Sequence, residues 1–314
     1  MYQNHNVDGH SFMTPCQTIA DTQDRVGESP VWDVRAQRLW WVDIEGPFVR
    51  CCQPGSLEPV QSWRMPERVG CIALTGVQGQ LVAAMETGIA RITLHEGAQA
   101  NVQWLARITH PAAGMRFNDG RCDASGRLWV GTMVMDMSLA SAQGGLYCLD
   151  ERGLTGPHVT GLLTPNGLGM SPDGRVLYLS DSHPTVQKIW AFDLDVVTGT
   201  LSQQRLFVDM NSWPGRPDGA AVDAQGHYWI CGNDAGQIHA FDAQGHWTRS
   251  LTVPMPKPSM CAFGGAELDQ LLVTSIIPAQ TTEAARGLSG AVIALQPGVR
   301  GMPEPVFSRF PASV

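Results

Sequence analysis

The stretch NDGRCDASGRLWVGT, residues 118–132, contains the pattern that decides the expected fold. In it, a turn rich in Asp and Gly leads directly into the β-forming residues Leu-Trp-Val at 128–130. The stretch DGAAVDAQGHYWICG, residues 218–232, has the same order, with Asp-Ala-Gln-Gly ahead of Tyr-Trp-Ile. Asp and Gly in a short turn beside β-forming residues are typical of a β-hairpin. Both stretches therefore predict β-hairpins.

This pattern of turn, strand, turn and strand recurs along the chain in six copies. They span Trp32 to Cys52, Leu74 to Leu94, Cys122 to Leu149, Ser171 to Leu194, Val222 to Phe241, and Gly264 to Leu295. The first large residues after the turns are Leu39, Leu81, Leu128, Leu177, Tyr228 and Leu271. Their mean spacing of about 46 residues suits a four-stranded propeller blade. The repeat predicts an all-β, six-bladed β-propeller.

The composition agrees with a single all-β domain over residues 1–314. Charged residues make up only 16%, while 34 Gly and 21 Pro indicate many turns. A β-sandwich needs no repeat of this length, and a solenoid would need polar capping repeats that the sequence lacks. We expect residues 1–15 to be a flexible N-terminal segment. Two longer insertions, at 135–143 and 277–288, are expected to be loops over one face.

The repeat also predicts which residues face the axis of the propeller, because the innermost strand of each blade lines the central channel. Ten or eleven positions before the six large residues stand Glu28, Gly70, Asn118, Asn166, Asp218 and Met260. Four of these six carry side-chain oxygen atoms. We therefore expect a ring of oxygen donors in the channel.

Two carboxylates and two amide oxygens at one point would repel each other or lack partners, and a hard divalent cation removes both problems. A ring without His or Cys favours Ca²⁺, Mg²⁺ or Mn²⁺ over structural zinc. Asn and Asp can instead serve only their own turns, and this is the interpretation for Asp119 and Asp173. Glu28 and Asp218 are assigned to the metal. The tryptophans on the predicted strands, Trp40, Trp41, Trp129 and Trp229, are assigned to core packing.

Charge and cysteine content limit the partners. A net charge of −8 gives no basic surface for nucleic acid or an anionic membrane. The eight cysteines show no CxxC or zinc spacing, so they are interpreted as reduced thiols. The N-terminal stretch resembles no signal peptide, and no run of eighteen apolar residues occurs. We expect a cytoplasmic protein, monomeric or dimeric.

Other catalytic patterns are absent. The sequence contains no G-x-S-x-G elbow, no P-loop and no complete G-x-G-x-x-G, and His95-Glu96 lacks the second His of a zincin helix. The nine histidines are scattered and are interpreted as surface or structural residues.

The sequence resembles the SMP-30, gluconolactonase and regucalcin family, to which luciferin-regenerating enzyme also belongs. The resemblance runs from about Val26 to Phe310. It rests on the order and spacing of Gly27-Glu-Ser-Pro-Val-Trp32, Arg116-Phe-Asn-Asp-Gly120 with Gly131-Thr-Met133, Pro165-Asn-Gly167 with Ser171-Pro-Asp-Gly174, Arg216-Pro-Asp-Gly219, and Lys257-Pro258 before Cys261-Ala-Phe-Gly-Gly265.

The resemblance implies a role for each site residue. Glu28, Asn166 and Asp218 would bind one divalent metal ion in the central channel (Ca, Zn, Mn, Mg or Fe), and Asp218 would also handle the proton. Arg116 and Asn118 would hold the substrate. Some members place an acidic residue, commonly Glu, in the loop after Gly-Thr-Met, where it contacts sugar hydroxyls. Asp136 stands at that place here and is one carbon shorter.

The expected activity is metal-dependent hydrolysis of a sugar-acid lactone to its aldonate, a gluconolactonase-like reaction of carbohydrate metabolism. In this scheme the metal polarises the ester carbonyl and Asp218 orients and deprotonates water. The base remains open between Asp218 and metal-bound water. Two alternatives remain, namely a related propeller hydrolase acting on phosphoesters or organophosphates, and a calcium-binding protein with incidental lactonase activity. Arg116, Asn118 and Asp136 favour the lactonase, since organophosphate sites need apolar walls.

Overall fold

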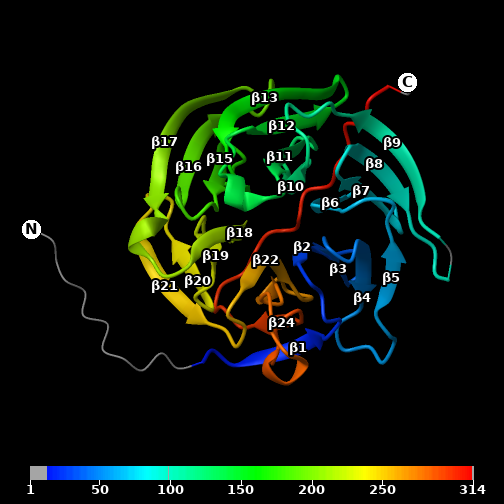
Figure 1. Cartoon of the computed structure of the whole chain (residues 1–314), viewed down its shortest axis with the longest axis vertical. Coiled ribbons are helices and arrows are strands. Elements are labelled where there is room, and N and C mark those ends of the chain that lie inside the picture. The colour runs from blue at the N-terminus through cyan, green and yellow to red at the C-terminus, as the bar shows by residue number, and fades with distance from the viewer. Residues whose placement is uncertain (1–12, 98, 313–314) are drawn as a thin grey trace, which may run out of the picture.

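The structure is a computed structural model that describes residues 13–97 and 99–312. Six four-stranded antiparallel sheets stand around a common axis, as Figure 1 shows in a view along that axis. The predicted six-bladed β-propeller is confirmed. Of the expected N-terminal segment 1–15, residues 1–12 lie outside the described residues.

Each blade runs outward from an innermost strand at the axis to an edge strand at the rim. Blade 1 comprises β2 (Gly27–Asp33), β3 (Arg38–Asp43), β4 (Phe48–Cys52) and β5 (Gln61–Arg64). Blade 2 comprises β6 (Cys71–Leu74), β7 (Gln80–Ala84), β8 (Gly88–Thr93) and β9 (Asn101–Arg107). Blade 3 comprises β10 (Met115–Cys122), β11 (Leu128–Val134), β12 (Gly144–Asp150) and β13 (Gly153–Leu162).

The second half of the ring repeats this arrangement. Blade 4 comprises β14 (Pro165–Met170), β15 (Val176–Asp181), β16 (Lys188–Leu194) and β17 (Leu201–Asp209). Blade 5 comprises β18 (Arg216–Val222), β19 (Tyr228–Asn233), β20 (Gln237–Phe241) and β21 (Trp247–Thr252). Blade 6 comprises β22 (Pro258–Gly264), β23 (Gln270–Ser275), β24 (Val292–Leu295) and β1 (Cys16–Ala20).

Blade 6 joins the two ends of the chain. β1, the first strand in the sequence, pairs antiparallel with β24 and forms the edge of the last blade. Ser259 at the start of β22 also donates a hydrogen bond to the carbonyl of Gly27, which connects blade 6 to blade 1. The ring is therefore closed by its first and last strands.

The hydrophobic side chains of each hairpin pack between neighbouring blades. The large residues used to measure the repeat all lie on the second strand of their blades and are buried. Trp40, Trp41, Trp129 and Trp229 are buried as predicted. The indole N–H groups of three of them donate to buried aspartates, from Trp41 to Asp24 at 2.7 Å, and from Trp129 to Asp123 and Trp229 to Asp223 at 3.0 Å each.

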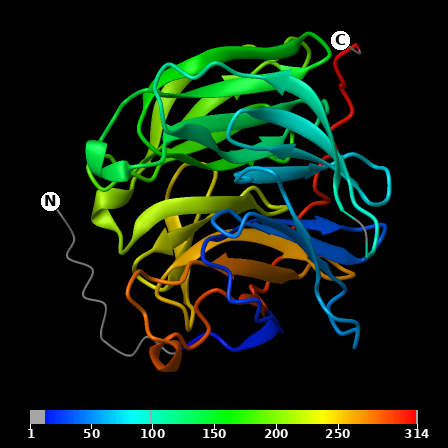
Figure 2. The same cartoon turned by 45° about the vertical axis from the view of Figure 1, so that its right-hand side comes forward.

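The two ends of the central channel differ. At one end, which we call the open mouth, the innermost strands begin and the second and third strands of each blade are connected. Both long insertions lie at this end, as predicted. One is the rim loop (residues 135–143), which contains the 3₁₀ turn η1 (Met137–Leu139), and the other contains η3 (Glu283–Ala285). Figure 2 shows them on one side of the ring and the C-terminal segment on the other.

The C-terminal strap (residues 298–310) crosses the opposite end of the channel, as the red trace in Figure 1 shows. Its backbone bonds to blades 6, 2 and 3, through Gly301 N–H to Leu268 O, Phe307 N–H to Leu74 O and Ser308 N–H to Gly126 O. Glu304 forms an ion pair with buried Arg121 at 3.0 Å, and Phe307 is fully buried. The strap thus covers this end.

No helix in the described part of the chain has the length and apolar character needed to cross a bilayer. All eight cysteines are described, and each is a free thiol.

Candidate active site

The predicted ring residues come together at the open mouth. Glu28 lies on β2, Asn118 on β10, Asn166 on β14 and Asp218 on β18, and all four side chains are buried. The two other positions of the ring, Gly70 and Met260, carry no oxygen on their side chains.

Local irregularities of the strands turn these side chains toward the axis. The pairing of the innermost with the second strand shifts register between Glu28 and Val31, and it shifts again beside each of the other three ring residues. Bulges of this kind bend a strand and change the direction in which a side chain points. β6 pairs regularly with the second strand of its blade. Gly70, directly before β6, has no side chain, and an added Cβ would lie 2.4 Å from the carbonyl oxygen of Phe117. Gly70 therefore lets β10 pack closely against the start of blade 2.

Asp218 is the centre of the hydrogen bonding in the ring. The amide of Asn166 donates to Asp218 Oδ1 at 2.5 Å, and the amide of Asn233 donates to Asp218 Oδ2. The oxygen of the Asn166 amide, Oδ1, is buried and has no hydrogen-bond partner among the described residues. Since an unpaired buried carbonyl oxygen costs about 1–3 kcal/mol, this atom points to a ligand that it would contact.

The carboxylates of the ring are poorly compensated. Burial raises the pKa of Glu28 well above its ordinary value, and the neighbouring Asp218 and Asp119 carboxylates raise it further. The backbone N–H of Ser29, at 3.0 Å, is the hydrogen-bond donor to Glu28 in the described structure. Burial likewise raises the pKa of Asp218 to about 6, although nearby Arg216 acts in the opposite direction. A bound cation would remove this repulsion.

The donor set fits a hard divalent cation. Glu28 and Asp218 supply carboxylate oxygens and Asn166 supplies an unpaired amide oxygen, which are the ligand types that such ions prefer. Within the described residues, no group of three or more His, Cys, Asp or Glu side chains is arranged to hold a metal. The set proposed here differs from such a group because one of its three members is an amide.

Arg116 and Asn118 lie on the same strand beside this set. Arg116 Nη1 donates to the carbonyl of Phe117 at 2.9 Å and to Asn118 Oδ1 at 2.5 Å. Asn118 Nδ2 donates to the carbonyl of Pro165 at 2.9 Å. The polar atoms of Asn118 are therefore occupied within the protein, whereas half-buried Arg116 keeps further N–H groups for a ligand.

Asp136 lies on the rim loop, is exposed, and contacts its own loop. Its Oδ1 accepts hydrogen bonds from Ser138 N–H at 3.0 Å and from Ser138 Oγ at 2.6 Å, so it caps η1. The described structure shows no hydrogen bond from Asp136 to a ring residue. The contact of Asp136 with a sugar stays a prediction.

Sequence reasoning missed Asn233 and misassigned Asp119. Asn233 lies on the second strand of blade 5, and the count of positions covered only innermost strands. Asp119 Oδ2 accepts from Leu168 N–H of blade 4 at 2.7 Å, and its Oδ1 has no partner in the described structure, so the prediction of a role in its own turn was wrong. Asp173 does serve its turn, through Ser171 Oγ and Arg175 N–H.

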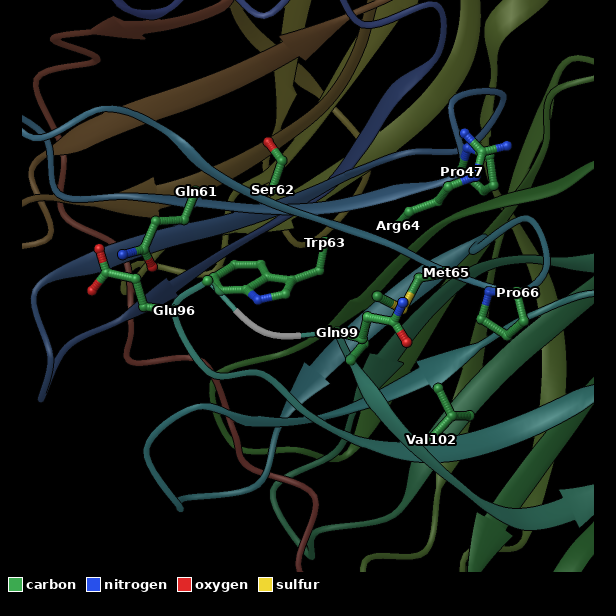
Figure 3. A pocket seen from close by; sticks show the side chains of 12 residues that line it. Pro47, Gln61, Ser62, Trp63, Arg64, Met65, Pro66, Glu96, Gln99 and Val102 are labelled. Atoms are coloured by element: carbon green, nitrogen blue, oxygen red, sulfur yellow. The ribbon is translucent and has the colours of Figure 1, made fainter.

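A wide groove of about 950 Å³ lies elsewhere, at the rim between blades 1 and 2 (Figure 3). Trp63, Arg64 and Met65 line one part of it, and Gln99 and Val102 line another. None of the ring residues contributes to the groove. It is therefore separate from the candidate site.

The chain is similar to known proteins over most of its length. A family model described as SMP-30/Gluconolactonase/LRE-like region matches residues 26–277. A 6-deoxy-6-sulfogluconolactonase of Pseudomonas putida is 34% identical and covers 90% of this chain and 95% of its own length. A pentonolactonase of Haloferax volcanii is 32% identical, and the match covers 91% of this chain and 96% of the pentonolactonase. A solved regucalcin of Agrobacterium tumefaciens, named as a calcium-binding protein, superposes with a TM-score of 0.85 at 25% sequence identity. The superposition covers 94% of this chain and 98% of the regucalcin chain.

Proposed function

Because this chain belongs to the SMP-30/gluconolactonase/LRE-like family, we propose that it hydrolyses sugar-acid lactones to aldonates with one divalent cation in its central channel. The sugar-acid lactonases among its relatives support this reaction class. The observation that carries the proposal is the buried set of Glu28, Asn166 and Asp218 at the open mouth, in which the Asn166 amide oxygen has no partner among the described residues and the Glu28 carboxylate lies near other carboxylates.

In this proposal Glu28, Asn166 and Asp218 hold the cation. When bound, the cation supplies Lewis-acid polarisation of the ester carbonyl and stabilises negative charge on its oxygen. The remaining steps belong to side chains of the protein.

Asp218 orients the attacking water and accepts its proton. The amides of Asn166 and Asn233 donate to the two carboxylate oxygens of Asp218, which fixes the orientation of the carboxylate. Arg116 donates its free N–H groups to oxygens of the lactone, and Asn118 holds the guanidinium in place through Oδ1. These contacts orient the ester bond for attack.

The calcium-binding function named for the solved regucalcin is a second candidate, since it would use the same oxygen donors. Turnover separates the two functions. A binding protein would hold the cation without hydrolysing any lactone.

The test uses protein stripped of metal with a chelator and then supplied separately with Ca²⁺, Zn²⁺, Mn²⁺, Mg²⁺ or Fe²⁺. Acid release is measured with gluconolactone, xylonolactone, arabinonolactone, galactonolactone and a sulfonated sugar lactone. We expect hydrolysis to be lost on chelation and restored by at least one cation. Activity that survives exhaustive chelation would contradict the metal assignment, and cation binding without hydrolysis of any lactone would favour the binding protein.

A further inference from the structure

His183 connects the rim loop to the neighbouring blade. It lies in the connection between β15 and β16 (residues 182–187), which we call the bracket loop, at the open mouth. The imidazole is buried, with its Nε2 atom 3.0 Å from the carbonyl oxygen of Met137. Met137 is the first residue of η1 and follows Asp136 directly. The histidine thus contacts the turn that presents Asp136.

The hydrogen bonds of His183 define its tautomer. The backbone N–H of Thr185 lies 3.3 Å from Nδ1, and Thr185 Oγ1 lies 2.8 Å from the same atom. A backbone N–H can only donate, so Nδ1 accepts and the neutral ring carries its proton on Nε2. His183 therefore donates to the carbonyl of Met137.

This hydrogen bond has no substitute in the described structure. The other hydrogen bonds of the rim loop in the described structure stay within blade 3 or the segment just before it, as Met135 N–H to Gly114 O and the turns inside η1 do. Among hydrogen bonds and ion pairs of the described residues, the contact from His183 alone joins the rim loop to a neighbouring blade. Loss of this contact would leave the loop attached only through its own blade.

The bracket loop is fixed firmly enough to act as an anchor. Buried Asp181 accepts hydrogen bonds from the backbone N–H groups of Leu163, Thr164 and His183, at 2.8, 3.0 and 3.0 Å. The first two of these residues come just before Asn166, a proposed metal ligand. From blade 5, Arg216 donates to the carbonyl of Ser182 at 3.1 Å.

From these contacts we propose that His183 is a positioning residue. It holds the rim loop, and with it Asp136, in the position required for recognition of substrate hydroxyls. The inference rests on the proposed lactonase function. His183 acts on the affinity for hydroxylated substrates and leaves the cation and the ester chemistry unchanged.

The test compares His183→Ala with His183→Gln, because the Gln side chain also carries an N–H donor at the ε position. We expect His183→Ala to raise KM for the preferred aldonolactone by about five- to tenfold, which corresponds to one hydrogen bond. The kcat value, the affinity for the cation by calorimetry, and kcat/KM for a lactone without hydroxyls should stay at the parent values. His183→Gln should restore most of the loss. His158→Ala, at an exposed position on β13, is the control and should change none of these quantities.

Hydrogen–deuterium exchange provides a readout that does not depend on activity. The amides of residues 135–143 should exchange faster in His183→Ala and near the parent rate in His183→Gln. Unchanged exchange in His183→Ala, equal losses on both lactones, or a loss of cation affinity would each overturn the proposal. If the parent protein hydrolyses no lactone, the proposed function fails, while the exchange rates still decide whether His183 holds the loop.

Discussion

Two buried carboxylates at opposite ends of the innermost strands, Asp123 near the C-terminal strap and Glu28 at the open mouth, differ in their hydrogen-bond partners. Near the C-terminal strap, Asp123 accepts hydrogen bonds from Ser125 N–H, from Arg127 N–H and Nε, and from Trp129 Nε1, at distances between 2.6 and 3.1 Å. At the open mouth, Glu28 accepts one hydrogen bond from the described part of the chain, from Ser29 N–H. Buried polar groups in native proteins are nearly always paired. The number of hydrogen-bond partners therefore distinguishes a carboxylate that stabilises the fold from a carboxylate that we expect to bind a ligand.

Removal of a carboxylate at the open mouth should have the largest effect on function. We expect Glu28→Ala and Asp218→Ala each to abolish cation binding and to lower kcat/KM for an aldonolactone by about 10⁴-fold, or ~5.5 kcal/mol. Both variants should stay folded, because the ring lies at the axis and not in the packing between blades. Calorimetry, steady-state kinetics and thermal unfolding measure the three quantities. Turnover near the parent rate in either variant would refute the assignment of the ligands.

Removal of a carboxylate at the strap end should show the opposite pattern. Asp123→Ala leaves buried Arg127 without its ion pair, and we expect the free energy of unfolding to fall by about 3 kcal/mol. Cation affinity per folded molecule should stay unchanged. Denaturant titration measures the loss. Asp173→Ala, which removes an exposed turn carboxylate, is the matched control and should cost less than about 1 kcal/mol. Equal stability of the two variants would show that full pairing at Asp123 does not mark a structural role.

Removal of the exposed Asp136 carboxylate on the rim loop should have the smallest effect of the three substitutions. If its carboxylate accepts hydrogen bonds from sugar hydroxyls, Asp136→Ala should lower kcat/KM for an aldonolactone by about ten- to a hundredfold, or 1.5–3 kcal/mol, and spare a lactone without hydroxyls. The ratio of the two rate constants cancels general damage to folding.

A second substitution separates the sugar contact from the cap of η1. Asn caps a helix as well as Asp does, so Asp136→Asn keeps the cap and removes the charge. A parent-like ratio in Asp136→Asn together with a changed ratio in Asp136→Ala would assign the effect to the cap. An equal loss of kcat/KM for both lactones in Asp136→Ala would contradict the proposed contact between Asp136 and the sugar.

The repeat in the sequence predicted the propeller and four residues of the ring, because one period of a blade places equivalent positions at the axis. It could not predict side-chain contacts between different strands, whether of one blade or of two. Asp119 meets Leu168 on the next blade, and Asn233 reaches Asp218 from a neighbouring strand. The C-terminal strap follows no repeat, so nothing in the periodicity indicated that Phe307 would be buried.

The closure of the ring by β1 and β24 has a consequence for how the protein folds. Ala20 pairs with Val292, and bringing together positions roughly 270 residues apart carries a loop-closure cost of about 5 kcal/mol. Hairpins within a blade are local and need no such step. During synthesis, the first strand emerges long before its partner, so the seam cannot form until β24 has been made. Glu28 and Asp218 belong to blades on the two sides of that seam. We therefore expect the oxygen ring to be completed only after β24 has been made and has paired with β1.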